Sequence, residues 1–511
     1  MPAGTPITVP AIVGTFINNP PFNQIGFTDQ SLNVLIREDE LQTRPGLNQV
    51  GQNLNEIVLG FAPPCRDTSD QTVLIAATNL HWWKLNMATD LYTNIANVAL
   101  TQALMPTTFT YFFQGAHQYM IGVNDKDPTK EFDITQNTVF ATIAAAPIGR
   151  TCATVANRVV IGNLLYSGTR FPNDVQWSSV ADRTSWPAIA RNTLPDTADN
   201  IMAIRTLGRN SAAILMERSQ WIMQAQLGSD AAAFSFTVMD HSPGPIGPAA
   251  CDIGPGGMQV VYLGEDGNIW SFNGVQSQMI YQTQRYIAGR VNFVTKYLTA
   301  VAYQHAQQEI WISIALDGDF YPTHLLIYSY KNSQVYIQQT PSTIPVTAMG
   351  LCICELSTPT NQLPDVPTNQ LPDIPTNFLG VSSKIEELIM GNTVGTYHWE
   401  GTLDAGSNIF NDWRLLMPVI PGSNYVFDGL EIMAEPMDAQ SGAFTVSVQL
   451  GPAYDNLTET ILGVLDPSDS ATLSITNVEL NGRVVVVRIT GNGYLKIRRL
   501  EVRAWEARVM I

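Results

Sequence analysis

One hairpin unit recurs along most of this chain and restricts the fold more than any other feature. The unit is a run of apolar residues, a short polar turn and a second strand opened by an aromatic residue. Clear and looser copies begin near residues 73, 118, 158, 212, 260 and 309. These starting points lie 40 to 54 residues apart. Such a spacing is typical of a β-propeller, in which each repeat forms one four-stranded blade.

The copy at residues 260–270 carries Asp266 and Gly267 between its apolar runs, and this dipeptide favours a two-residue hairpin turn. Six units predict an all-β protein with a six-bladed β-propeller over residues 31–404, preceded by an irregular segment at 1–30. A strand at residues 32–36, followed by a tight turn at Pro45-Gly46, is expected to complete the last blade and close the ring.

The pattern changes after one more hairpin of the blade type at residues 388–399. In segments 444–450 and 494–505, apolar residues alternate with polar or charged ones. Alternation with a period of two indicates strands that have one wet face and one buried face. We therefore expect residues 405–511 to form a small C-terminal β-sandwich.

An eight-residue duplication interrupts the propeller region. Residues 359–366 and 367–374 are identical except for the last position, Val366 in the first copy and Ile374 in the second. Their regularly spaced prolines favour extended backbone. We interpret the segment 355–377 as a surface loop or linker, with a docking arm for a partner as the alternative.

Charge and cysteine content exclude several classes of protein. The 511 residues include 27 Lys and Arg against 44 Asp and Glu, a net charge of −17, which argues against a surface that binds nucleic acid by its phosphates. No apolar run approaches 18 residues and the N-terminal residues do not resemble a signal peptide, so neither a membrane span nor export is expected. Five scattered cysteines suit reduced thiols, and Cys352 and Cys354 lack companion ligands, so no metal or cofactor is expected.

The sequence offers no catalytic motif, and we expect no enzyme activity. A nucleophile elbow, a phosphate-binding glycine loop and a His-Glu-x-x-His helix are all missing, and the six histidines show no ligand spacing. The alternative is a propeller glycosidase of the sialidase kind, whose turns carry Ser-x-Asp-x-Gly-x-x-Trp. Residues 179–186 and 263–270 each come close to this motif but depart from it in the position of the aspartate and at one other position.

Basic residues gather near the C-terminus. Seven of the 27 Lys and Arg lie in the last 30 residues. One interpretation is a solvated strand face, and the other is a contact surface for an acidic patch of a neighbouring subunit or adaptor. The candidate contact residues are Lys496, Arg498, Arg499 and Arg503.

Several short motifs, taken in order, resemble the tail nozzle (tail hub) proteins of short-tailed bacteriophages. These motifs are residues 32–34 with 44–46, residues 171–178 with Asp182 and 186–187, residues 244–274 ending in 264–267, and residues 488–491 with 500–502. The resemblance covers most of the chain, but the duplication at 359–374 is no part of it.

The resemblance implies a ring of six copies below the portal and adaptor proteins, located in the virion tail after synthesis in the host cytoplasm. It also implies a conduit for ejection of double-stranded DNA and an attachment platform for tail fibres, spikes or needle/knob proteins. An acidic lumen would suit this role, and we expect no measurable affinity for duplex DNA. A glycan-binding or glycan-hydrolysing tail protein, or a propeller used as a general interaction platform, are the alternatives.

Overall fold

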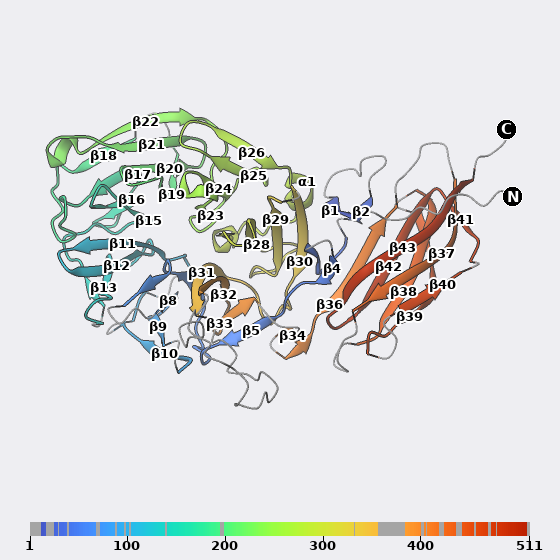
Figure 1. Ribbon diagram of the computed structural model, residues 1–511. Helices are drawn as coiled ribbons and strands as arrows, with labels where there is room; N and C mark the ends of the chain where they lie inside the picture. The colour runs from blue at the N-terminus through green and yellow to red at the C-terminus, as the bar shows by residue number, and fades with distance from the viewer. Residues whose placement is uncertain are drawn as a thin grey trace, which may run out of the picture.

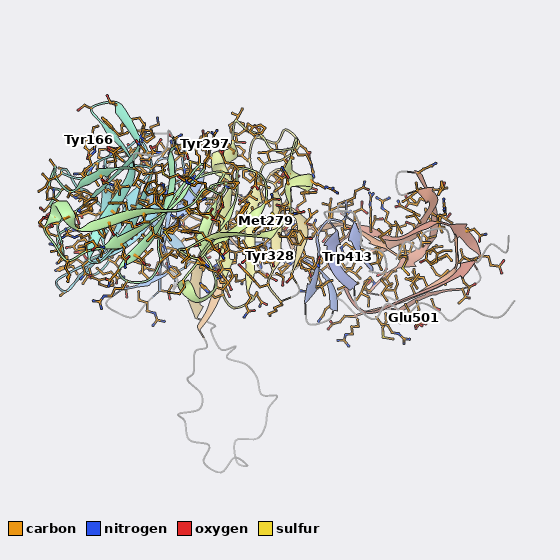
Figure 2. The ribbon with its side chains drawn as sticks, turned by 90° about the horizontal axis from the view of Figure 1, so that it is seen from above. Tyr166, Met279, Tyr297, Tyr328, Trp413 and Glu501 are labelled. Atoms are coloured by element: carbon orange, nitrogen blue, oxygen red, sulfur yellow. The ribbon has the colours of Figure 1, made fainter. Side chains whose placement is uncertain are left out.

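The computed structural model describes residues 12–16, 25–28, 30–37, 40–67, 72–86, 89–96, 99–101, 104–137, 140–194, 199–331, 333–355, 384–399, 403–404, 406–417, 424–435, 442–453, 456–468, 472–476 and 478–507. These residues form an all-β protein with two parts, a β-propeller and a C-terminal β-sandwich (Figure 1). Viewed from above, the sandwich, marked by Trp413 and Glu501, lies beside the propeller (Figure 2).

Seven antiparallel sheets in the described part of the chain are the blades of the propeller. From the innermost strand outward, the first three are β6 (Val58–Phe61), β8 (Thr72–Thr78), β9 (Trp82–Asn86), β10 (Leu91–Asn94), with β7 (Cys65–Arg66) beside β8; β11 (Thr108–Gln114), β12 (His117–Val123), β13 (Lys130–Asp133), β14 (Ala141–Thr142); and β15 (Thr151–Val155), β16 (Arg158–Tyr166), β17 (Thr169–Trp177), β18 (Arg191–Thr193).

The next three blades are β19 (Ile201–Thr206), β20 (Ser211–Met216), β21 (Gln220–Ala225), β22 (Phe234–Asp240); β23 (Cys251–Ile253), β24 (Val260–Leu263), β25 (Ile269–Phe272), β26 (Ser277–Tyr281); and β27 (Ala300–Gln304), β28 (Glu309–Ile314), β29 (His324–Ser329), β30 (Gln334–Gln339). The seventh is β31 (Ala348–Glu355), β32 (Lys384–Gly391), β33 (Thr396–Trp399) and β5 (Leu47–Val50), extended by β34 (Leu403–Asp404) and β35 (Ser407–Asn408). Short helical turns lie at Asp230–Ala232, Pro255–Gly257, α1 (Gln284–Ile287) and Lys296–Leu298.

The predicted count of six blades is wrong, because the blade at residues 348–399 was not counted. Each innermost strand contacts the next, and β31 contacts β6, so the described strands form a closed ring of seven. The seventh blade breaks the repeat spacing in two ways. The duplicated segment separates its first two strands, and its outermost strand β5 comes from the N-terminal part of the chain.

Ring closure by an N-terminal strand is confirmed, but the strand is β5 rather than the one predicted at residues 32–36. β3 (Val34–Arg37) pairs with β4 (Glu40–Thr43), and β4 pairs with β43 of the sandwich. Val34 and Leu41 are buried in the sandwich core. The propeller therefore begins near Leu47, not at residue 31.

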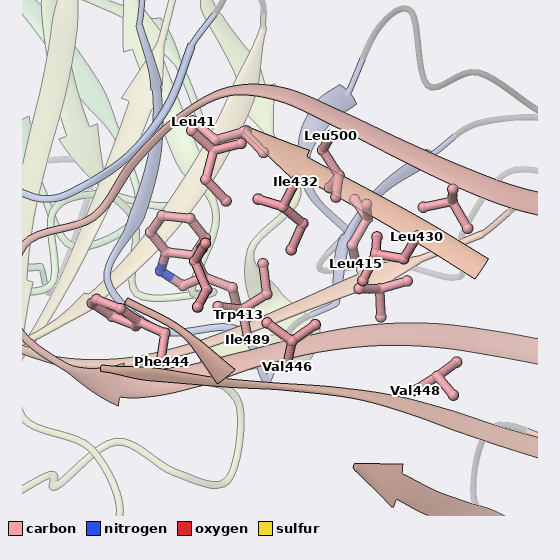
Figure 3. Close-up of a cluster of buried hydrophobic side chains, with 14 of the residues drawn as sticks. Leu41, Trp413, Leu415, Leu430, Ile432, Phe444, Val446, Val448, Ile489 and Leu500 are labelled. Carbon is pink, nitrogen blue, oxygen red and sulfur yellow. The ribbon is translucent and has the colours of Figure 1, made fainter. Parts of the chain in front are cut away.

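The C-terminal sandwich consists of two packed sheets, as predicted. One contains β36 (Phe410–Leu416), β42 (Val484–Asn492), β38 (Phe444–Ala453) and β39 (Asn456–Leu465), and the other contains β3, β4, β43 (Lys496–Ala507), β37 (Asn424–Ala434), β40 (Thr472–Ile475) and β41 (Leu480–Gly482). Alternate residues from both sheets, among them Trp413, Ile432 and Phe444, fill the core (Figure 3). Two further strands, β1 (Ile12–Phe16) and β2 (Ile25–Thr28), join β30 of the sixth blade to β36, so one ten-stranded sheet runs from propeller to sandwich.

The hairpin at Asp266 shows why the repeat was visible in the sequence. The Asp266 carboxylate accepts hydrogen bonds from the Asn268 backbone (3.1 Å) and from Trp270 Nε1 (3.1 Å), and Gly267 has a φ of +79°. A residue with a side chain is strained at that angle, which explains the glycine. Middle strands such as β28 are buried along their whole length, because neighbouring blades cover both faces, so they are continuous apolar runs.

Candidate functional site

The junction between propeller and sandwich is held by a buried ion pair. Arg44 and Asp404 have exposed side-chain fractions of 0% and 2% and form a bidentate pair, with one oxygen at 2.8 Å from Nη1. Arg44 also donates to Asn33 Oδ1 (3.0 Å) and to the Gln339 carbonyl of the sixth blade (3.1 Å), and its guanidinium lies 5.1 Å from the Trp399 ring centre. One side chain therefore connects the N-terminal segment, two blades and the start of the sandwich.

The resemblance motif at residues 171–187 forms contacts within the third blade and between blades. Trp177 is buried, and its Nε1 donates to the Asp230 carbonyl of the fourth blade at 2.8 Å. Arg183 pairs with Glu131 of the second blade, with a distance of 3.0 Å from Nη2 to Oε1. Its guanidinium lies 3.4 Å from the Tyr119 ring centre. These residues thus stabilise the ring.

Two more arginines tie the third blade to its neighbours. Arg158 pairs with Asp230 of the fourth blade at 2.7 Å, and Arg170 pairs with Asp125 of the second blade at 2.7 Å. Hydrogen bonds from Ser179 and Arg158 hold the pKa of the Asp230 carboxyl below its ordinary value. Partly buried pairs of this kind fix the angle between adjacent blades, because each arginine matches a carboxylate in one geometry.

A cavity of about 410 Å³ lies on the propeller axis and is lined by residues of all seven innermost strands. Most of the lining is apolar, and its charged residues are Arg205 and Asp252. Arg205 donates to the Cys251 carbonyl at 3.2 Å, and Asp252 accepts from the Tyr303 backbone N–H at 2.8 Å. Burial raises the pKa of the Asp252 carboxyl, partly offset by these backbone hydrogen bonds and by Arg205.

The axial cavity cannot serve as a passage for duplex DNA. Its volume lies in the range of small-molecule pockets, about 300–1,000 Å³, whereas the major groove of a duplex is alone about 12 Å wide. Its two charged side chains bond to the backbone of adjacent blades, which makes them ties between the fourth, fifth and sixth blades. Any conduit must therefore lie between copies of the chain.

The predicted basic contact surface on β43 has acidic neighbours from the same chain. Lys496 Nζ lies 3.0 Å and Arg498 Nη2 lies 3.1 Å from the Glu435 carboxylate, and Arg499 pairs with Glu501 at 2.7 Å. The side chains of Arg498 and Arg499 are about half exposed. The side chain of Arg503 lies outside the described part of the structure. The structure thus brings three of the four residues to one strand, where two of them share one carboxylate.

The structure also places the residues of the glycosidase alternative. Asp182 accepts hydrogen bonds from the backbone and hydroxyl of Thr184, and Asp266 bonds within its own turn. Both aspartates therefore stabilise turns. Four histidines lie beside a carboxylate, for example His81 at 2.7 Å from Glu56 and His398 at 3.1 Å from Glu387. In the described ranges, no three His, Cys, Asp or Glu side chains are grouped as metal ligands.

Sequence reasoning missed the exposed apolar residues on one face of the propeller. The connections between first and second strands and between third and fourth strands emerge on the same face, because neighbouring strands in a blade are antiparallel. Seven large apolar residues on these connections are exposed, over the first five blades: Leu91, Phe113, Val180, Ile189, Leu227, Met258 and Val275. Their only sequence signal is an apolar residue inside a turn. Exposed apolar side chains collected on one face are typical of protein contact surfaces.

The described residues define a β-propeller protein with a C-terminal β-sandwich. No protein-family model and no curated protein matches the chain. Among solved structures it is similar to BamB from Moraxella catarrhalis, at 11% identity and a TM-score of 0.34, over 74% of this chain and 96% of that one. It is also similar to an extracellular domain from B. thetaiotaomicron, at 10% identity and a TM-score of 0.40, over 76% of this chain and 43% of that one. In the described ranges, no helix has the length and apolar content needed to span a membrane.

Proposed function

We propose that this chain is a structural subunit of a hexameric tail nozzle of a short-tailed bacteriophage. The ring would lie below the portal and adaptor, form a conduit for double-stranded DNA and carry fibres, spikes or a needle/knob protein. The proposal places the chain in the virion tail and assigns it no catalytic step and no cofactor.

One observation supports the proposal most strongly, namely that the resemblance motifs have structural roles. Residues 44–46 and 32–34 lie at the buried junction around Arg44, and residues 171–187 tie three blades together. A ten-stranded sheet also runs through the junction, so propeller and sandwich are connected by backbone hydrogen bonds as well as by an ion pair. A stiff two-part subunit of this kind suits a ring that must keep its shape while DNA passes.

The charge balance supports the same proposal. Each copy carries −17, so six copies carry 6 × −17, or −102. If part of this charge lines the space between copies, a duplex is repelled from the wall and can slide, whereas a basic wall would hold its phosphates.

The test begins with the purified full-length chain, analysed by native mass spectrometry and electron microscopy. We expect rings of six with an axial hole between copies, and no binding of duplex DNA at about 150 mM salt. A chain that remains monomeric within purified particles, or that binds duplex DNA tightly with strong salt dependence, would contradict the proposal. A sugar-release assay on host polysaccharide tests the glycosidase alternative.

A charge reversal tests the contact role of β43. We expect Arg498→Glu with Arg499→Glu to abolish ring or tail assembly, because the new carboxylates would face Glu435, Glu501 and an acidic partner. The matched control reverses Glu435→Arg in the same chain, which restores the internal pairing without restoring the outward positive charge of Arg499. Normal incorporation of the double variant into particles would rule out the contact role.

A further inference from the structure

The sandwich ends in an unusually long open sheet edge. β39 is the last strand of the ten-stranded sheet and pairs along one side with β38. It has ten residues, which at about 3.3 Å per residue run about 33 Å. Among the described residues, no backbone hydrogen bond reaches the other side of Asn456–Leu465. A row of backbone N–H and C=O groups therefore faces outward, and only an extended strand can pair with such a row.

β39 also lacks most of the features by which proteins protect an open edge. Such edges usually are short or carry Lys or Pro. The outermost strands β10, β14, β18 and β26 have two to five residues, and β30 is covered by β1. In β39 there is no Lys, Arg or Pro, and its one charged residue, Glu459, pairs with Arg488 at 3.0 Å on the face of its own sheet. A bulge at Leu462 is its single protective feature.

Two β-branched residues on β39 are exposed to solvent. Ile461 has an exposed fraction of 70% and Val464 has one of 57%. An added strand would cover both side chains, so apolar burial would accompany the backbone hydrogen bonds. This combination is the arrangement by which sheets accept a strand from another chain.

A second edge with matching properties lies on the propeller. β22, the outermost strand of the fourth blade, has seven residues, the most of any uncovered blade edge in the described ranges. Its only charged residue is Asp240 at its C-terminal end. Figure 1 shows β22 on the rim of the propeller, separate from the blades that adjoin the sandwich, and β39 at the margin of the sandwich. The two edges thus lie on different surfaces of one chain.

We propose that β39 of one copy pairs with β22 of the next copy, and that this added strand joins neighbouring subunits. The inference rests on the proposed ring, because a cyclic ring requires a contact between two different surfaces of the same chain. Two strands that are nearly free of charge suit this contact, since each copy carries −17 and charged surfaces would repel. Pairing of β39 with another β39 would instead give a two-fold dimer.

The first experiment places charges on the edge. Ile461→Lys with Val464→Lys changes two exposed side chains, so the subunit itself is expected to fold normally. We expect at least tenfold weaker association by native mass spectrometry and light scattering, because two ammonium groups would lose water at the contact. The control, Leu227→Lys with Val275→Lys, makes the same chemical change on exposed propeller loops and should leave association unchanged.

The second experiment identifies the partner strand. Copies with Ile461→Cys are mixed with copies with Thr237→Cys and treated with a short bis-maleimide. We expect cross-links in the mixture and not in either variant alone, where the native cysteines supply the background. Cross-linking of the Ile461→Cys variant to itself would overturn the pairing with β22. If wild-type rings form and the lysine variant forms the same rings, the edge inference fails while the nozzle proposal stands. If the wild-type chain forms no ring, both fail.

Discussion

Replacing Asp404 with asparagine removes one charge from the junction of propeller and sandwich and keeps its shape. Arg44, whose side chain is fully buried, then keeps its positive charge without a carboxylate partner. Its remaining hydrogen bonds go to neutral oxygens, Asn33 Oδ1 and the carbonyls of Pro45 and Gln339. These oxygens compensate a guanidinium charge only in part.

The expected loss of stability is large for a single side chain. Removing one partner of a buried ion pair costs about 3–5 kcal/mol, because the other charge stays buried. We place Asp404→Asn near the lower end, about 3 kcal/mol, since three neutral acceptors remain around Arg44. Arg44→Met with Asp404→Leu removes both charges and should cost less than the sum of the two single changes.

Chemical unfolding monitored by tryptophan fluorescence measures this loss. Trp399 lies against Arg44 and 4.8 Å from Trp311, so the signal reports on the junction itself. A midpoint for Asp404→Asn within error of the wild-type midpoint would refute the argument. Strict additivity of the two single changes in the double variant would do the same, because independent side chains show no coupling.

Two further predictions follow from shifted pKa values. Burial would raise the pKa of Asp412, but its hydrogen bonds from Arg488 and Arg414 outweigh this and lower it below 3.8. Its contribution to stability is therefore complete above its ordinary pKa and is lost as the pH falls through the lowered value, so Asp412→Asn should flatten the acid limb of a stability-against-pH curve. An unchanged acid limb would contradict this. Burial also raises the pKa of Cys152 to about 12 and those of Cys65 and Cys251 to about 11. Disulfide reagents at pH 8 should react with these thiols only after unfolding, and rapid reaction of the native chain would show that the thiols are accessible.

The contrast between two blades shows how far sequence reasoning reached. The fifth blade was evident, because Asp266 and Gly267 form a local turn between two apolar runs that are adjacent in the chain. In the seventh blade, β31 and β32 are separated by the duplicated segment, and β5 joins from more than 300 residues away. Periodicity detects neighbours along the chain, so a blade assembled from distant segments gives no periodic signal.

The basic strand β43 illustrates a similar limit for the candidate site. Its positive residues were evident from composition, but the carboxylate of Glu435 between Lys496 and Arg498 was not, because it belongs to the neighbouring strand β37 and the connection. The exposed edge of β39 was equally hidden. Whether a strand lies inside a sheet or at its margin depends on which other strands pair with it.

The sequence by itself determined the all-β class, the hairpin repeat and the alternating strands of the sandwich, since each depends on residues close together in the chain. The tertiary structure decided the number of blades, the strand that closes the ring and the transfer of β3 and β4 to the sandwich. It also decided the partner of Arg44, which lies 360 residues away. The physical reason is that backbone edges and buried charges accept any partner of suitable geometry, and only the folded chain determines which segment meets them.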